Sequence, residues 1–234
     1  MGNARGQVKE LLNRAGVEVM GYRWTFRSRR SRLLGNVDVL ADVGANVGQY
    51  GKEVRSAGWA GHLISYEPLA GAFAALEATA AQDPSWTAVR TAVGSEPGEL
   101  SLNVSEDSVF TSALAALDRG KAVFSGLDTM RTETAPVATL DSLLADHRDG
   151  LLGVKVDVQG FERDVLLGAP ETLKSAVYWE MELTPVALYD GQMLMGEALE
   201  LLSEAGLVLV AVENIFSDVH SGRSLQFNGI FLRD

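Results

Sequence analysis

The sequence has no cysteine and contains little proline or histidine. Its 234 residues include 6 Pro, 3 His and no Cys. The absence of cysteine excludes a disulfide framework, a thiolate metal site and a cysteine nucleophile. The first ten residues are polar, unlike a signal peptide, and no apolar run is long enough to span a bilayer. We therefore expect a cytoplasmic protein with no stable membrane insertion.

Charge is distributed unevenly along the chain. The net charge is −11, yet residues 1–32 carry eight Lys and Arg against two Glu. In this segment arginines alternate with the aromatic residues Tyr22, Trp24 and Phe26. Such a pattern could bind nucleic acid, an anionic lipid or a polyanionic substrate, but the acidic body would repel a polyanion. We favour an amphipathic segment whose aromatics pack on the domain and whose arginines pair with acids or face solvent, and we expect no nucleic-acid partner.

Strand and helix patterns alternate, which predicts one domain with a parallel sheet covered by helices. The polar stretch 106–133 is expected to be a loop region that faces substrate, and the last two strands are expected to pair antiparallel. We divide the chain into an N-terminal helical and basic segment, residues 1–36, and a main domain, residues 37–234. Strands are expected at 37–43, 62–67, 86–93, 98–104, 151–158, 176–183, 207–213 and 224–232, and helices at 7–15, 47–57, 71–81, 161–167 and 193–205.

The most informative segment is DVGANVGQY, residues 42–50, which joins a buried strand to a helix. Small residues let the backbone approach a ligand, and a helix N-terminus offers unpaired N–H groups. Asn46 stands where a middle glycine would be expected, and Asn tolerates a positive φ. Asp42 would repel a pyrophosphate and could hold an ammonium group, which favours S-adenosylmethionine over a dinucleotide. The alternative is an ordinary tight turn between a strand and a helix.

An acid also ends the second expected strand, in Tyr66-Glu67-Pro68. In doubly wound sheets an acid at this place accepts hydrogen bonds from ribose hydroxyls. Pro68 would stop the strand there. A solvated acid at a strand end is the alternative.

A third motif, KVDVQGFE, occupies residues 155–162. Lys155 and Asp157 are two apart on one strand and therefore share a face. Asp157 lies near the carboxyl end of that strand, where ligands bind in open α/β sheets. Glu162 falls in the first turn of the next helix, where its charge suits the helix dipole. A structural Lys–Asp pair and a helix-start acid are the alternative.

Two further acids, Glu180 and Glu182, share a face of the next apolar strand. With Asp157 they could form an oxygen-rich cluster for Mg²⁺, but they could equally pair with arginines or bind substrate hydroxyls. We treat the metal as the minority interpretation, assign no metal ligand, and expect Lys155, Glu180 and Glu182 to contact substrate.

Histidine would suit general-base work. His147 and His220 are the candidates, although no motif surrounds either. His62 stands at the start of a strand and is expected to be structural.

Three segments together resemble the FkbM family of S-adenosylmethionine-dependent methyltransferases. They are DVGANVGQYG (42–51), YEP (66–68) and KVDVQGFERDVLLGA (155–169), and the resemblance covers roughly residues 37–183. It implies an α/β fold of the class I methyltransferase type, Rossmann-like, with a seven-stranded mostly parallel sheet and helices on both faces. It also implies methyl transfer, usually to a hydroxyl of a sugar, polyketide or related metabolite.

The resemblance assigns roles to particular positions. Asp157 would face the reacting centre, and Glu67 would bind the cofactor's ribose. Gln159 stands where many relatives carry Glu, which weakens a metal site through that position. The residues expected to bind the cofactor are Asp42, Gly44, Asn46, Gly48, Glu67, Pro68 and Val93.

We therefore expect an S-adenosylmethionine-dependent O-methyltransferase that acts on a hydroxyl of a sugar, glycolipid or natural-product metabolite. Asp157, His147 or His220 would accept the proton of that hydroxyl. Its partner would be a small-molecule or glycan acceptor, and a homodimer is left open. One alternative is an NAD-dependent oxidoreductase, for which no catalytic Tyr–Lys pair can be placed. The other is a non-catalytic Rossmann-like module that binds a partner through residues 23–32.

Overall fold

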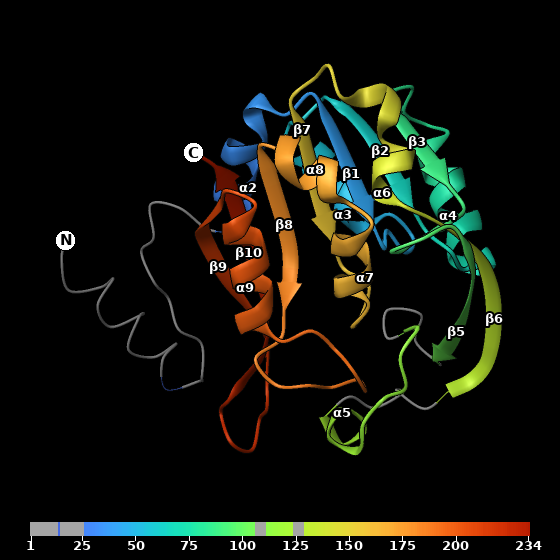
Figure 1. The fold of residues 1–234 in the computed structure, drawn as a ribbon, viewed down its shortest axis with the longest axis vertical. Coiled ribbons are helices and arrows are strands. Elements are labelled where there is room, and N and C mark those ends of the chain that lie inside the picture. Colours follow the sequence, from blue (N-terminus) through green and yellow to red (C-terminus); the bar gives the residue numbers. More distant parts are fainter. Residues whose placement is uncertain (1–13, 15–25, 106–110, 124–128) are drawn as a thin grey trace.

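A computed structural model describes residues 14, 26–105, 111–123 and 129–234 of the chain (Figure 1). The helix expected at 7–15, apart from Arg14, and the aromatic residues Tyr22 and Trp24 lie outside the described residues. Within the described ranges, no helix is long and apolar enough to cross a membrane.

A seven-stranded sheet forms the centre of the described structure. Its strands are β1 (Val39–Val43), β2 (His62–Tyr66), β3 (Trp86–Val89), β7 (Leu152–Val156), β8 (Tyr178–Leu183), β9 (Leu207–Ser217) and β10 (Ser224–Arg233). Their order is β3-β2-β1-β7-β8-β10-β9. Neighbouring strands from β3 to β8 run parallel, and β10 runs antiparallel to both β8 and β9. The predicted mostly parallel sheet with an antiparallel end is therefore confirmed.

Helices cover both faces of this sheet (Figure 1). One face carries α2 (Phe26–Leu33), α3 (Gln49–Ser56) and α4 (Ala70–Ala80), and the other carries α6 (Leu140–Leu143), α7 (Glu162–Leu167), α8 (Pro170–Ser175) and α9 (Met195–Glu204). Each face has its own apolar core. Leu34, Val54 and Leu76 belong to the first core, and Leu140, Val165 and Leu202 to the second. Because both faces are buried, the parallel strands need nearly continuous apolar sequence, such as Val39-Leu40-Ala41 in β1.

A second, three-stranded sheet lies beside the first and was only partly predicted. It consists of β4 (Ala92–Val93), β5 (Gly98–Ser105) and β6 (Thr129–Ala138), in the order β4-β6-β5. The strand expected at 98–104 is confirmed. The loop expected through residue 133 is wrong at its end, because β6 begins at Thr129 and pairs antiparallel with β5. The single strand expected at 86–93 is also wrong, because β3 ends at Val89 and β4 belongs to the second sheet.

In Figure 1, β5 and β6 extend as a long ribbon away from the central sheet, toward α5 (Asp118–Val123). A two-stranded ribbon of this kind leaves much of its surface to solvent, which suits a polar sequence such as Thr132-Glu133-Thr134. This explains why the apolar pattern that marks the central strands is missing from β6.

Candidate active site

A pocket of about 330 Å³ opens at the carboxyl ends of β1, β2 and β7. This is the edge where open α/β sheets bind ligands, and the volume lies in the range of small-molecule sites. The segments that follow all three strands line it, as the motifs predict. The predicted site residues that line the pocket are Gly44, Asn46, Glu67, Pro68, Val93, Lys155, Asp157 and Glu180.

The turn after β1 has left-handed backbone at three positions, Gly44 (φ +77°), Asn46 (φ +48°) and Gly48 (φ +84°). Asn46 therefore does adopt a positive φ, as expected from its tolerance of this conformation. A Cβ atom at Gly44 would lie 1.9 Å from the carbonyl oxygen of Asp157. Glycine is thus required there so that the turns after β1 and β7 can touch.

Glycine at position 48 has a different reason. A Cβ atom there would lie 3.1 Å from Leu76 and 3.2 Å from Trp86, which belong to the core beneath the turn. Part of the glycine pattern therefore reflects packing of α3 against its neighbours, and only Gly44 and Asn46 of this turn's predicted residues face the pocket directly.

The Glu67 carboxylate connects the turn after β1 to the segment after β2 through two hydrogen bonds. Its Oε2 accepts the backbone N–H of Asn46 at 2.8 Å, and its Oε1 accepts that of Leu69 at 2.9 Å. Burial raises the pKa of Glu67, and these two N–H donors oppose the rise. A carboxylate offers about four acceptor positions, so Glu67 keeps capacity for hydroxyl donors in the pocket that it lines.

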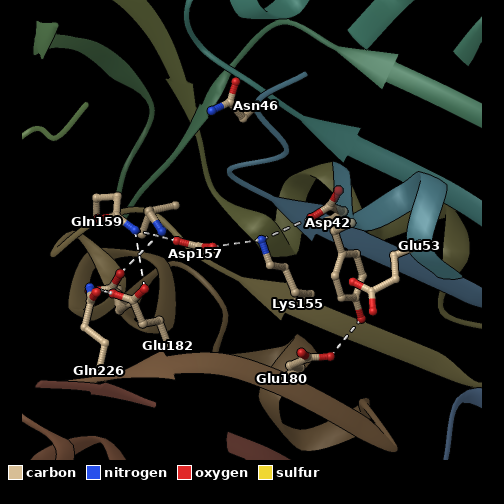
Figure 2. A network of polar contacts seen from close by, with 12 residues as sticks. Asp42, Asn46, Glu53, Lys155, Asp157, Gln159, Glu180, Glu182 and Gln226 are labelled. Atoms are coloured by element: carbon tan, nitrogen blue, oxygen red, sulfur yellow. Dashed lines mark hydrogen bonds and ion pairs between the residues drawn. The ribbon is translucent and has the colours of Figure 1, made fainter. Parts of the chain in front are cut away.

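Lys155 lies between two carboxylates (Figure 2). Its Nζ is 3.5 Å from Asp42 Oδ1 and 3.4 Å from Asp157 Oδ2. Burial alone would lower the pKa of Lys155, but these two carboxylates and that of Glu180 together outweigh burial and raise it, so the ammonium stays charged. Lys155 lies on β7 and Asp157 directly follows it, and their side chains meet on one side of the chain, as their spacing predicts.

Asp42 lies beneath the pocket and is 0% exposed. Ser65 Oγ donates to its Oδ2 at 3.2 Å. Burial raises the pKa of Asp42, and the Lys155 ammonium opposes that rise. Because the side chain has no exposed surface, Asp42 acts on the pocket through Lys155 and through the turn that it begins.

Asp157 projects into the pocket with each oxygen held by a different donor. Gln159 Nε2 donates to Oδ1 at 2.8 Å, and the Lys155 ammonium faces Oδ2. The Asp157 side chain is 36% exposed, against 9% for that of Lys155. It is therefore a carboxylate that is fixed in orientation and still accessible to a ligand.

Glu182 lies behind Asp157 and is bound by two glutamines (Figure 2). Gln226 Nε2 donates to its Oε1 at 2.6 Å, and Gln159 Nε2 is 3.4 Å from its Oε2. Burial and the nearby carboxylates of Asp157 and Glu162 raise the pKa of Glu182 well above its ordinary value. Sequence reasoning missed a role for both glutamines; only the position of Gln159 inside the third motif could have indicated one.

Glu180 pairs with an arginine, one of the three interpretations that its sequence leaves open. Arg30 Nη2 is 2.6 Å from Glu180 Oε1, and the hydroxyls of Tyr50 and Tyr178 donate to Oε2 at 2.9 Å and 2.6 Å. Arg30 Nη1 also lies 3.0 Å from Glu53. Among the residues that the structure describes, no group of three or more His, Asp or Glu could hold a metal ion.

The two histidine candidates lie away from the pocket. The ring of His147 stacks on that of His62, with centroids 5.7 Å apart, and His62 begins β2 at the end opposite the pocket. His220 is exposed in the connection between β9 and β10. Of the three predicted bases, Asp157 is the one that lines the pocket.

Comparison with known proteins agrees with this geometry. The family model described as "Methyltransferase FkbM domain" matches residues 42–209. No curated protein matches the chain. The crystal structure of methyltransferase FkbM from Methylobacillus flagellatus superposes with a TM-score of 0.52 at 12% identity, over 84% of this chain and 44% of that one. The likeness shows a shared fold, and this chain spans less than half the length of that protein.

Two other solved structures are more weakly similar. Fibrillarin from Aeropyrum pernix, in complex with natively bound S-adenosyl-L-methionine, gives a TM-score of 0.49 at 9% identity, over 86% of this chain and 68% of that one. A TehB-like SAM-dependent methyltransferase from Corynebacterium glutamicum gives a TM-score of 0.43 at 14% identity, over 98% of this chain and 96% of that one.

Proposed function

Because the chain belongs to the methyltransferase FkbM family, whose members use S-adenosylmethionine, we propose that it methylates a hydroxyl group of a sugar, glycolipid or natural-product metabolite. The observation that carries the proposal is the position of Asp157. Its accessible carboxylate stands in the pocket, and its backbone touches the glycine turn at Gly44.

The residues at one end of the pocket fit the cofactor. Gly44 and Asn46 bring the backbone of the turn to the pocket wall, and Glu67 presents a carboxylate suited to the ribose hydroxyls. Pro68 and Val93 add apolar surface beside it. When bound, S-adenosylmethionine supplies an electrophilic methyl group.

The acceptor would meet Asp157. Methyl transfer is an in-line displacement, so most of the catalysis comes from positioning. An alcohol must also lose its proton, and we assign that proton to the Asp157 carboxylate. The Lys155 ammonium lies 3.4 Å from Oδ2 and holds that oxygen in place, so the Asp157 carboxylate keeps one orientation in the pocket.

Calorimetric titration tests the cofactor assignment. We expect S-adenosylmethionine and S-adenosylhomocysteine to bind, NAD not to bind, and Glu67→Ala to weaken binding by about tenfold or more, because one charge-assisted hydrogen bond is worth roughly 1.5–3 kcal/mol. Glu77→Ala is the matched control, since Glu77 is an exposed glutamate on α4. Binding of NAD alone would favour an oxidoreductase, and binding of none of the three would favour a non-catalytic module.

A further inference from the structure

Gln159 lines the pocket beside Asp157 and makes four polar contacts there. Its Nε2 donates to Asp157 Oδ1 at 2.8 Å and lies 3.4 Å from Glu182 Oε2. The Tyr189 hydroxyl donates to its Oε1 at 3.2 Å, and Ser112 Oγ donates to its backbone oxygen at 2.6 Å. These partners come from β8 and from the segments that follow β5, β7 and β8.

The chemistry of these partners fixes the orientation of the amide. Two carboxylate oxygens on one side require the N–H₂ group, because an amide oxygen there would face two acceptors. The Tyr189 hydroxyl on the other side can donate to the amide oxygen, since burial raises the pKa of Tyr189 and keeps it protonated. Each polar atom of the Gln159 side chain therefore has a partner of the correct kind.

The backbone at this place is held in an unusual conformation. Gln159 has φ +51° and Gly160 has φ +103°. The carboxylate of Glu162 accepts the backbone N–H of Val158 at 3.3 Å and that of Gly160 at 3.1 Å, which closes the turn. A non-glycine residue at positive φ carries strain that surrounding contacts must offset, and such strain is concentrated at functional sites.

We propose that Gln159 is a positioning residue that aims the Asp157 carboxylate at the acceptor. Its amide holds Oδ1 while the Lys155 ammonium holds Oδ2, so the carboxylate cannot rotate. The same N–H₂ group lies 3.4 Å from Glu182 Oε2, so it also links the Asp157 carboxylate to β8. The inference rests on the proposed function for the identity of the reaction, but the contact itself does not depend on it.

The contact is tested first by NMR, without any acceptor. The Gln159 side-chain amide signals are assigned by their loss in Gln159→Met, which has similar length but no donor. We expect these signals to move most in Asp157→Asn and less in Glu182→Gln, because the first hydrogen bond is the shorter. Signals that respond to Glu182→Gln and not to Asp157→Asn would overturn the proposal.

Turnover tests the consequence. With an acceptor found by screening, we expect Gln159→Met to lower kcat by about tenfold or more and to change the Kd for S-adenosylhomocysteine less than twofold. Gln226→Met is the matched control: it removes the 2.6 Å donor to Glu182 and should lower kcat less. Equal effects of the two substitutions, or an unchanged kcat in Gln159→Met, would overturn the proposal.

Two precautions separate the ways in which this test can fail. If Met does not tolerate the positive φ, Gln159→Asn replaces it, because Asn adopts this backbone and shortens the amide's reach by one methylene. If the unmodified protein methylates no acceptor, the proposed function fails, whereas the NMR experiment still decides whether Gln159 holds Asp157.

Discussion

Arg30 and Glu180 form a buried ion pair although 150 residues separate them in the sequence. Arg30 Nε lies 3.0 Å from both carboxylate oxygens, and both side chains are buried. Burial would lower the pKa of Arg30, but Glu180, with Tyr50 and Tyr178, outweighs burial and raises it, so the guanidinium stays charged. The pair fixes α2, which precedes the family-matched region, to strand β8 of the seven-stranded sheet.

Removal of this arginine should destabilise the protein strongly. Arg30→Ala would leave Glu180 buried with the tyrosine hydroxyls but without its ion-pair partner, and we expect the free energy of unfolding to fall by about 3–5 kcal/mol. Urea denaturation measures the change. Arg29→Ala, an exposed position on the same helix, should change it by less than about 0.5 kcal/mol.

A double variant tests why Arg30→Ala loses stability. If the uncompensated charge is responsible, adding Glu180→Gln to Arg30→Ala should restore part of the stability. A double variant that is less stable than Arg30→Ala would contradict this explanation.

Gly44→Ala should damage both the fold and the pocket. The new Cβ would lie 1.9 Å from the Asp157 carbonyl oxygen, at a φ of +77°. We expect the free energy of unfolding to fall by about 1–3 kcal/mol and the binding of S-adenosylhomocysteine to weaken. Gly71→Ala on α4 is the control, because nothing lies within 4 Å of its Cβ; it should leave binding unchanged and stabilise by roughly 0.5 kcal/mol. Similar results for the two variants would refute the steric argument.

Glu162 should make stability depend on pH near neutrality. Burial raises its pKa from 4.5 to about 7, against the opposing effect of backbone N–H donors. The folded state therefore binds a proton more tightly than the unfolded state, and this group's contribution to stability falls as pH rises from about 4.5 to about 7.

Glu162→Gln removes that dependence while it keeps an acceptor for the backbone N–H groups. Asp157, Glu182 and Tyr189 lie near Glu162 and remain in both proteins, so the difference between the two proteins reports the titration of Glu162 together with its effect on Glu182 and Tyr189. We expect the stability of Glu162→Gln relative to the unmodified protein to increase by about 2 kcal/mol between pH 5 and pH 8. Parallel pH–stability curves from chemical denaturation would show that Glu162 is not the group responsible.

Substitution of each of the three predicted bases should show which one accepts the proton. Asp157→Asn is expected to lower kcat by about 100-fold or more while it preserves S-adenosylhomocysteine binding within about threefold, because Asn keeps the shape of the side chain. His147→Ala and His220→Ala should have smaller effects, since neither histidine lines the pocket. A larger loss in either histidine variant than in Asp157→Asn would move the role of base away from Asp157.

Local pattern was sufficient to predict the central sheet and one end of the pocket. Parallel strands buried on both faces produce apolar runs, and the turns that follow them carry the chemistry at one edge. Asp42, Glu67 and Asp157 could be placed in this way because each follows or ends such a run. The strain at Asn46 was also predictable, because few residue types accept it.

Pairings over long sequence distances could not be predicted. That Glu180 pairs with an arginine was one open interpretation, but no local pattern indicates Arg30. The roles of Gln159 and Gln226 depend on β7, β8 and β10 lying side by side, which fixes the distances among their amides and Glu182. The second sheet could be predicted only in part, because β5 alternates polar and apolar residues whereas β6 is polar and carries no such pattern.

The order of strands in the central sheet bears on how the protein forms during synthesis. β10 is made after β9 but lies between β9 and β8, so the growing chain must leave β8 with an open edge until residues 224–233 have emerged. Translation adds about 5–20 residues per second, which makes this interval short but finite. During it, the strand that carries Glu180 and Glu182 is open to pairing with any other extended segment, and we expect chains halted before Ser224 to depend on chaperones.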